Sequence, residues 1–258
     1  MRSSSLLAVM AIALTASAAV VAKDENLARA VNASHRSGDF VARDEYRRPL
    51  EELEFFGVKP NQVVVEIAPG GGYWTEILAP YLRDKGTLYT AVSARAAGDW
   101  KKKLDTNPEL YGKVKITTLG DPIQVAPAGS ADMVLTFRNV HNWMARGNAE
   151  QYFAAFYQAL KPGGVLGIEE HRAATDKPQD PQARNGYVRE DYTIALAEKA
   201  GFKLLGKSEL LANPKDTKDW PGGVWTLPPT LRLGDQDREK YLAIGEADNF
   251  LLKFQKPK

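Results

Sequence analysis

The chain has 258 residues, 44% of them hydrophobic, which is enough to bury the core of one α/β domain of ordinary size. Its formal net charge of +2 comes from interspersed bases and acids, and the sequence has no basic stripe with interleaved aromatic residues, which argues against nucleic acid as a partner. The absence of cysteine excludes a disulfide framework, a thiolate nucleophile, a cysteine-ligated zinc and a lipidated-cysteine anchor.

The first 22 residues have the pattern of a secretory signal peptide. Arg2 precedes an almost wholly apolar run from Leu6 to Leu14, and cleavage after Ala18 or after Ala22 satisfies the preference for small residues. The apolar run is shorter than the roughly 20 residues of a membrane span. We therefore expect a periplasmic or secreted protein that does not contact the membrane after cleavage, with an uncleaved anchor as the alternative.

A helical N-terminal cap, 23–57, is expected to precede the first strand. The β-branched run from Val63 to Ile67 is typical of a buried parallel strand. Gly70, Gly71 and Gly72 follow it and let the backbone turn sharply and approach a ligand without a Cβ in the way. A helix at about 74–82 and a second strand at 86–92 complete a β-α-β unit.

The same alternation continues along the chain. It predicts helices at 100–110, 149–160 and 189–200, and strands at 114–119, 131–137, 165–168, 202–205 and 249–254. We infer a single domain, 23–258, with a Rossmann-like seven-stranded mostly parallel sheet and helices on both faces. The long insertion before the last strand, 211–246, is expected to be a lid over the substrate pocket, with simple packing over the sheet edge as the alternative.

The glycine-rich turn has the order Glu66-x-Ala68-x-Gly70-x-Gly72, which differs from the Gly-x-Gly-x-x-Gly fingerprint of dinucleotide sites. It resembles the first motif of class I S-adenosylmethionine-dependent methyltransferases, with Ala68 in place of the first glycine. Gly120-Asp121 after the third strand resembles the acid that faces the adenine amino group in that family. The turn from Leu160 to Gly164 resembles the family's turn before the fifth strand.

Other motifs resemble an exported branch of predicted methyltransferases, above all Arg138-Asn139-x-His141-Asn142-Trp143 and Trp225-Thr226-Leu227-Pro228-Pro229. This resemblance implies S-adenosylmethionine as the cofactor and a small molecule as the substrate. It gives no oligomeric state. The cofactor-binding residues that it implies are Glu66, Ala68, Gly70, Gly71, Gly72, Ser93, Asp121, Arg138 and Asn139.

Ser93 departs from the family pattern, which usually places an acid at the end of the second strand to bind both ribose hydroxyls. A neutral hydroxyl forms a hydrogen bond roughly half as strong as a carboxylate does. The sequence therefore predicts either low cofactor affinity or another group that holds the ribose.

His141, His171 and Glu170 are the candidate catalytic residues, because they follow the fourth and fifth strands at the edge where open α/β sheets bind ligands. The ordinary pKa of an imidazole suits proton transfer, which makes His141 the candidate base. Two imidazoles and a carboxylate also form a known metal-ligand set. No pair of them has the i, i+4 spacing of a helical metal motif, and we therefore predict no metal site.

Export is in tension with a cofactor that is made in the cytoplasm, and two alternatives stay open. The first is a methyltransferase-like binding module that has lost turnover, which Ala68 and Ser93 favour. The second is a different enzyme on the same scaffold, because a fold does not determine a reaction. The sequence lacks the Gly-x-Ser-x-Gly motif of a serine hydrolase.

Overall fold

The computed structural model describes residues 24–258, so the predicted signal peptide lies outside the described residues. The strands form one seven-stranded sheet in the order β3-β2-β1-β4-β5-β7-β6. Neighbours from β3 to β5 are parallel, and β7 is antiparallel to β5 and β6. The strands are β1 (Val63–Ile67), β2 (Thr87–Ser93), β3 (Lys115–Leu119), β4 (Ala131–Phe137), β5 (Leu160–His171), β6 (Lys203–Ser208) and β7 (Asn249–Gln255).

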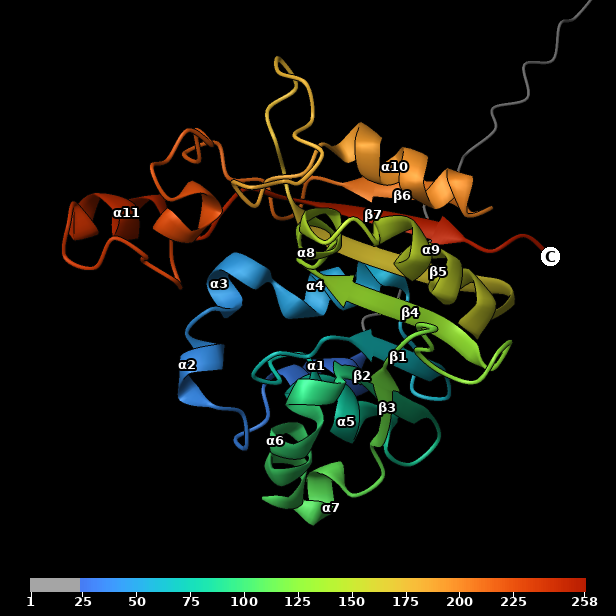
Figure 1. The fold of residues 1–258 in the computed structure, drawn as a ribbon. Coiled ribbons are helices and arrows are strands. Elements are labelled where there is room, and N and C mark those ends of the chain that lie inside the picture. The colour runs from blue at the N-terminus through green and yellow to red at the C-terminus, as the bar shows by residue number, and fades with distance from the viewer. Residues whose placement is uncertain (1–23) are drawn as a thin grey trace, which may run out of the picture.

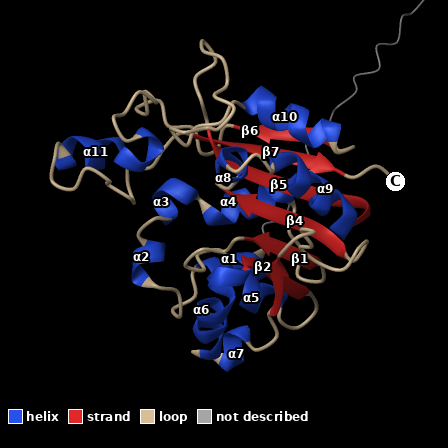
Figure 2. Ribbon diagram, viewed as in Figure 1, coloured by secondary structure: helices blue, strands red, loops and turns tan. Residues whose placement is uncertain are grey.

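Helices cover both faces of this sheet (Figures 1 and 2). The helices before β4 are α1 (Glu25–Val31), α2 (Gly38–Val41), α3 (Asp44–Arg47), α4 (Pro49–Phe56), α5 (Thr75–Leu82), α6 (Ala94–Asp105) and α7 (Pro108–Tyr111). Those after it are α8 (Val140–Ala145), α9 (Ala149–Ala159), α10 (Glu190–Lys199), the 3-10 helix η1 (Gly223–Thr226) and α11 (Arg238–Ile244). The predicted Rossmann-like fold class is therefore confirmed.

The two faces of the sheet bury two apolar clusters. One contains Phe153, Phe156 and Ala197 from α9 and α10, and the other contains Leu53 and Ile77 from α4 and α5. The interior strand β1, between β2 and β4, has almost no solvent-exposed side chain, because residues on both of its faces are covered. This double layer fixes the carboxyl ends of the parallel strands at one edge, where α2, α3 and the segment that carries α11 also lie (Figure 1).

Most predicted elements agree with the structure, with differences at their ends. The predicted helix 100–110 is two helices. The first, α6, begins earlier, at Ala94, because the Ser93 side chain accepts a hydrogen bond from the Ala96 N–H and caps it. It ends at Asp105, and α7 begins separately at Pro108, capped by Asn107. The strand predicted at 165–168 is longer, because pairing with β4 and β7 extends it over 160–171. The short helix α8 is not among the predicted elements.

The insertion 211–246 is ordered by its own small apolar cluster, which includes Tyr187, Leu227 and Tyr241. The buried carboxylate of Asp216 accepts hydrogen bonds from the Tyr187 hydroxyl at 3.0 Å and from Trp220 Nε1 at 2.7 Å. Asp216 also accepts a hydrogen bond from the Asp248 N–H at 2.9 Å, so polar as well as apolar contacts hold the segment to Tyr187 and to the residue before β7. Within residues 24–258, no helix is long and apolar enough to cross a membrane.

Candidate functional site

The glycine-rich turn between β1 and α5 has a left-handed backbone at three positions. Ala68 has φ 48°, Gly70 has φ 60° and Gly72 has φ 98°. Ala68 accepts this conformation although a left-handed non-glycine residue costs about 1–2 kcal/mol, and its N–H donates to the carbonyl of Ala91 on β2 at 2.9 Å. A Cβ placed on Gly70 would meet no atom within 4 Å, so the turn borders open space at this residue.

Two cavities meet at this turn and share its residues Ala68, Pro69 and Gly70. The first, the strand-end cavity, has a volume of about 500 Å3 and is lined by Ser93, Trp100, Lys103, Asn139, Trp143 and Tyr152. The second has a volume of about 340 Å3 and is lined by Arg43, Arg138, His141, His171, Trp225 and Glu246. We name it the lid cavity, because residues of the insertion 211–246 form part of its lining.

Aromatic and amide groups shape the strand-end cavity. Trp143 and Tyr152 stack with ring centroids 4.3 Å apart. Asn139 donates hydrogen bonds to the backbone oxygens of Ile67 and Phe137 at 3.3 and 3.2 Å, which fix its side chain beside the turn. Ser93 lies in this cavity as the sequence predicts, but its hydroxyl also caps α6.

Five predicted cofactor residues lie outside this cavity: Glu66, Gly71 and Arg138 line the lid cavity instead, and Gly72 and Asp121 line neither cavity. Asp121 is exposed and lines neither cavity, so the structure does not bring it together with Ser93 and Asn139. Glu66 lines the lid cavity, with Oε2 hydrogen-bonded to the Thr75 hydroxyl and Oε1 buried without a partner among the described residues. Burial raises the pKa of Glu66 to about 7, although the Thr75 hydrogen bond opposes this shift.

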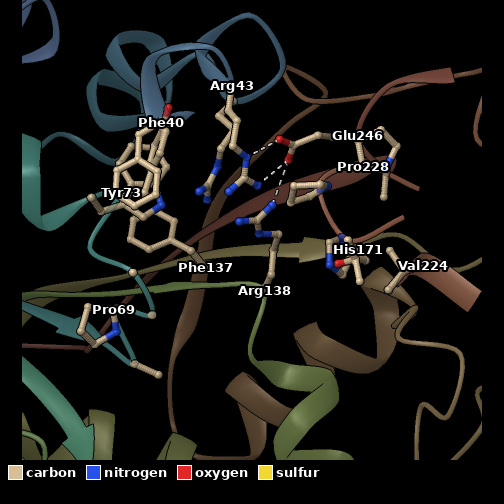
Figure 3. Close-up of a pocket in the computed structure, with 18 of the residues that line it drawn as sticks. Phe40, Arg43, Pro69, Tyr73, Phe137, Arg138, His171, Val224, Pro228 and Glu246 are labelled. Carbon is tan, nitrogen blue, oxygen red and sulfur yellow. Dashed lines mark hydrogen bonds and ion pairs between the residues drawn. The ribbon is translucent and has the colours of Figure 1, made fainter. Parts of the chain in front are cut away.

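An ion-pair cluster that joins distant segments lines the lid cavity (Figure 3). Glu246, just before β7, receives hydrogen bonds from Arg43 Nε at 2.6 Å and from Arg43 Nη2 at 2.9 Å. Arg138 Nη1 donates to the same carboxylate at 3.1 Å. Burial raises the pKa of Glu246, but the two guanidinium groups lower it by more, which keeps the carboxylate charged.

A second ion pair lies beneath the first. Arg47, which is almost fully buried, donates to Glu169 Oε2 at 3.0 Å, and Asn249 donates to the other oxygen of Glu169 at 3.1 Å. Both oxygens of the neighbouring Glu52 are buried without a partner among the described residues. Burial, and next the charge of Glu169, raise the pKa of Glu52 well above its ordinary value, which favours the protonated form of this side chain.

The three predicted catalytic residues come together beside the lid cavity, which His141 and His171 line and Glu170 does not. His141 Nδ1 lies 2.9 Å from Glu170 Oε1, and the backbone N–H of His141 donates to Oε2 at 3.2 Å. His171 packs beside His141 with ring centroids 5.5 Å apart. Burial lowers the pKa of His171 to about 3, so this imidazole is neutral at physiological pH. Burial raises the pKa of Glu170, but His141 lowers it by more, and Glu170 is a carboxylate.

Several lining residues were not predicted from the sequence. Arg43 and Glu246 pair across 203 positions, which no local pattern encodes. The i, i+4 spacing of Arg43 and Arg47 is the one sequence signal that indicates a shared arginine face. Trp100 and Lys103 lie on the predicted helix, yet nothing in that helix's pattern distinguishes cavity residues from packing residues.

No protein-family model matches the sequence, and no curated protein matches it at a significant level. Solved structures do resemble it. A SAM dependent methyltransferase from Aquifex aeolicus is 16% identical, with a TM-score of 0.58 over 83% of this chain and 93% of that chain. Phosphoethanolamine N-methyltransferase 2 of Haemonchus contortus, solved with S-adenosyl-L-methionine, is 15% identical, with a TM-score of 0.57 over 90% of this chain and 60% of that chain.

The cyclase SpnF is also similar, at 16% identity and a TM-score of 0.54 over 80% of this chain and 78% of that chain. Together these likenesses show that the chain has the class I methyltransferase fold. The resemblance read from the sequence is thus confirmed at the level of the fold, while membership of the exported branch stays a prediction. Because one similar structure is a cyclase, the reaction must be argued from the site.

Proposed function

We propose that the chain is an exported S-adenosylmethionine-dependent methyltransferase that acts on a small molecule. The observation that carries this proposal is the left-handed turn at Gly70, which borders open space and separates two cavities. A nucleoside that is joined to an amino acid needs two such compartments, with the backbone passing close between them.

The unpaired groups in the lid cavity fit the amino-acid part of this cofactor. Glu66 Oε1 and Trp74 Nε1 are buried, lack partners among the described residues and belong to residues that line the cavity. A buried polar atom without a partner is costly, and a ligand with complementary groups removes that cost. We assign Glu66 to the ammonium group, and Ser93 and Asn139 to the nucleoside side.

When bound, S-adenosylmethionine supplies an electrophilic methyl group, and the protein's task is to position an acceptor and remove its proton. His141 is the proposed base, acting through Nε2, because its Nδ1 is held by Glu170. The Glu170 carboxylate orients the ring and stabilises the imidazolium that forms on proton uptake. Trp225, whose ring centroid lies 5.9 Å from that of His141, covers this end of the cavity.

The size of the lid cavity supports a small-molecule acceptor. Its volume of about 340 Å3 is at the low end of small-ligand sites. The lid residues Val224, Trp225 and Pro228 line it together with Arg43 from the N-terminal cap, so segments from both ends of the chain enclose it. Because the amino-acid part of the cofactor takes some of this volume, only a small acceptor fits in the space that is left.

The proposal is tested by transfer of labelled methyl groups. Protein beginning at Lys23 is incubated with methyl-tritiated S-adenosylmethionine and the small-molecule fraction of a cell-envelope extract. We expect label in new small molecules, its loss in Gly70→Asp, and its retention in Gly129→Asp. Gly129 is a matched control, because it has φ 63° and open space around it but lies outside both cavities. Absence of label from every fraction would contradict turnover.

Export is tested separately. Expression of the full chain in a Gram-negative host, followed by mass measurement of the periplasmic protein, should give a chain that begins at Ala19 or Lys23. Recovery of the intact chain from the cytoplasmic fraction would contradict export and leave the proposed reaction unaffected.

A second candidate is a binding module without turnover. It is favoured by Ser93, whose hydroxyl already caps α6 at 3.3 Å and is a weak substitute for a ribose-binding acid. Cofactor binding without label transfer to any acceptor would support this candidate.

A further inference from the structure

Two imidazoles stand together in the lid cavity, although the proposed base mechanism uses only one of them. His141 lies in the first turn of α8 after β4, and His171 ends β5, the neighbouring parallel strand. Ligand-type atoms of His141, His171 and Glu170 all lie within 4.8 Å of one another. The arrangement is made by two adjacent strand ends, so the helical i, i+4 spacing is the wrong criterion for this cluster.

Hydrogen bonds fix the tautomer of His171. Asn249 Nδ2 donates to Glu169 Oε1 at 3.1 Å, so the Oδ1 of Asn249 is the atom that faces His171 as an acceptor. His171 Nδ1 lies 2.7 Å from this oxygen and therefore carries the proton. Its Nε2 is left with a lone pair.

The same reasoning applies to His141. Glu170 accepts backbone N–H bonds at both oxygens, from His171 at Oε1 and from His141 at Oε2, which marks both as acceptors. His141 Nδ1 lies 2.9 Å from Oε1 and is therefore the protonated nitrogen. Neither Nε2 of this pair has a hydrogen-bond partner among residues 24–258.

This pattern is the one found behind metal-ligating histidines, in which Nδ1–H is held by a carboxylate or carbonyl oxygen and Nε2 binds the ion. We propose that His141 Nε2 and His171 Nε2 bind a divalent transition-metal cation such as Zn2+ or Co2+. Glu170 and Asn249 are the positioning residues behind the two rings. Imidazole nitrogen favours these ions over Mg2+ or Ca2+.

The role of the ion rests on the proposed function. Both histidines line the lid cavity, so coordination positions not filled by protein are open to a hydroxyl or similar donor of the acceptor. A bound cation lowers the pKa of such a hydroxyl, and its proton passes to solvent. In the metal-loaded protein His141 is then a ligand, and the cation replaces it as the group that favours the deprotonated acceptor.

The test is a titration of untagged, chelator-treated protein with Co2+, followed by visible absorption. The chain has no cysteine, so no thiolate charge-transfer band overlaps the d–d bands. We expect saturation at one equivalent with micromolar affinity, and loss of the bands in His141→Ala and in His171→Ala. The third histidine of the chain gives the control: His35 Nε2 lies 2.8 Å from the Glu76 carbonyl oxygen, far from the pair in sequence, and His35→Ala should bind Co2+ as the wild type does.

Binding of S-adenosylhomocysteine to the same proteins, measured by calorimetry, separates the two proposals and reports whether each variant is folded. No Co2+ bands in a protein that binds S-adenosylhomocysteine would overturn the metal site and leave the methyltransferase proposal standing. Co2+ binding that survives both substitutions would also overturn the assignment. Co2+ binding lost in both variants, without any nucleoside binding but with circular dichroism showing folded protein, would support the metal site and contradict the methyltransferase proposal.

Discussion

The two cavities on either side of the glycine-rich turn are built in different ways. The strand-end cavity is made largely by consecutive β-α units, and Lys103, which pairs with Glu76 at 3.0 Å, is its half-buried charged residue. The lid cavity brings together Arg43, Arg138 and Glu246 from the cap, the fourth strand end and the lid. The difference teaches that consecutive β-α units supply the first cavity, whereas ion pairs between segments far apart in the sequence supply much of the second.

The largest expected effect is on stability, at the charged floor of the lid cavity. Arg47→Met leaves the fully buried Glu169 without its closest cation and should lower the free energy of unfolding by about 3–5 kcal/mol. The guanidinium of the adjacent Arg48 is half exposed and pairs with the half-exposed Glu51, so Arg48→Met should change the free energy of unfolding by about 0.5 kcal/mol or less. Urea unfolding followed by circular dichroism measures both, and equal losses would show that the buried pair has no special role.

The next largest effect is expected on local opening of the insertion 211–246, measured as amide hydrogen exchange. Glu246→Gln keeps the size of the side chain but removes the charge that Arg43 and Arg138 hold. Breaking a buried charge pair costs several kcal/mol, so amide hydrogen exchange in 223–244 should speed up by about tenfold or more. Glu239 on α11 is exposed, and Glu239→Gln is the control. Unchanged exchange in Glu246→Gln would mean that the lid is held by its apolar contacts alone.

The affinity for S-adenosylhomocysteine should depend on pH through Glu66. Burial raises the pKa of Glu66 to about 7, so the free protein is mostly protonated there below that pH. If the ionised form binds the ammonium group, affinity for S-adenosylhomocysteine should rise about tenfold between pH 6 and pH 8 and be flat in Glu66→Gln. Without ligand, the raised pKa makes the wild type lose stability relative to Glu66→Gln as the pH rises from 4.5 through 7. The same change of affinity with pH in the wild type and in Glu66→Gln would contradict the assignment of Glu66 to the ammonium group.

The smallest effect is expected in the strand-end cavity. Ser93→Asp supplies the acid that the family usually has, and aspartate also caps a helix, so α6 is retained. Because charge-assisted hydrogen bonds are roughly twice as strong as neutral ones, affinity for S-adenosylhomocysteine should rise by about fivefold. Ser93→Ala tests the cap alone and should lower stability by about 1 kcal/mol. Weaker nucleoside binding in Ser93→Asp would show that the ribose is held elsewhere.

Local sequence patterns predict the strands and helices well, whereas contacts between segments far apart in the sequence are not predicted. Apolar runs such as Val63–Ile67 and Ala131–Phe137 are local signals, and the structure has both strands at these bounds. The start of α6 was missed because Ser93 was interpreted as a strand-end hydroxyl, not as a helix cap. The pairing of Arg43 with Glu246 depends on folding of the whole chain, and no periodicity in the sequence records it.

The predicted site residues also agree with the structure only where strand order places them. His141, His171 and Glu170 were identified from their place after neighbouring strands, and the structure brings them together because β4 and β5 pair in parallel. Asp121 was assigned by its place after the third strand, yet the loop that follows leaves it exposed. Strand order therefore predicts which loops meet at an edge, but loop conformation decides which side chains face the cavity.

The most direct test of the proposed function is calorimetric titration of the protein that begins at Lys23 with S-adenosylmethionine and with S-adenosylhomocysteine. We predict micromolar binding of both, lost in Gly70→Asp, whose side chain would enter the open space at the turn, and retained in Gly129→Asp. Absence of heat with either ligand, in protein shown to be folded by circular dichroism, would contradict a cofactor site at this turn.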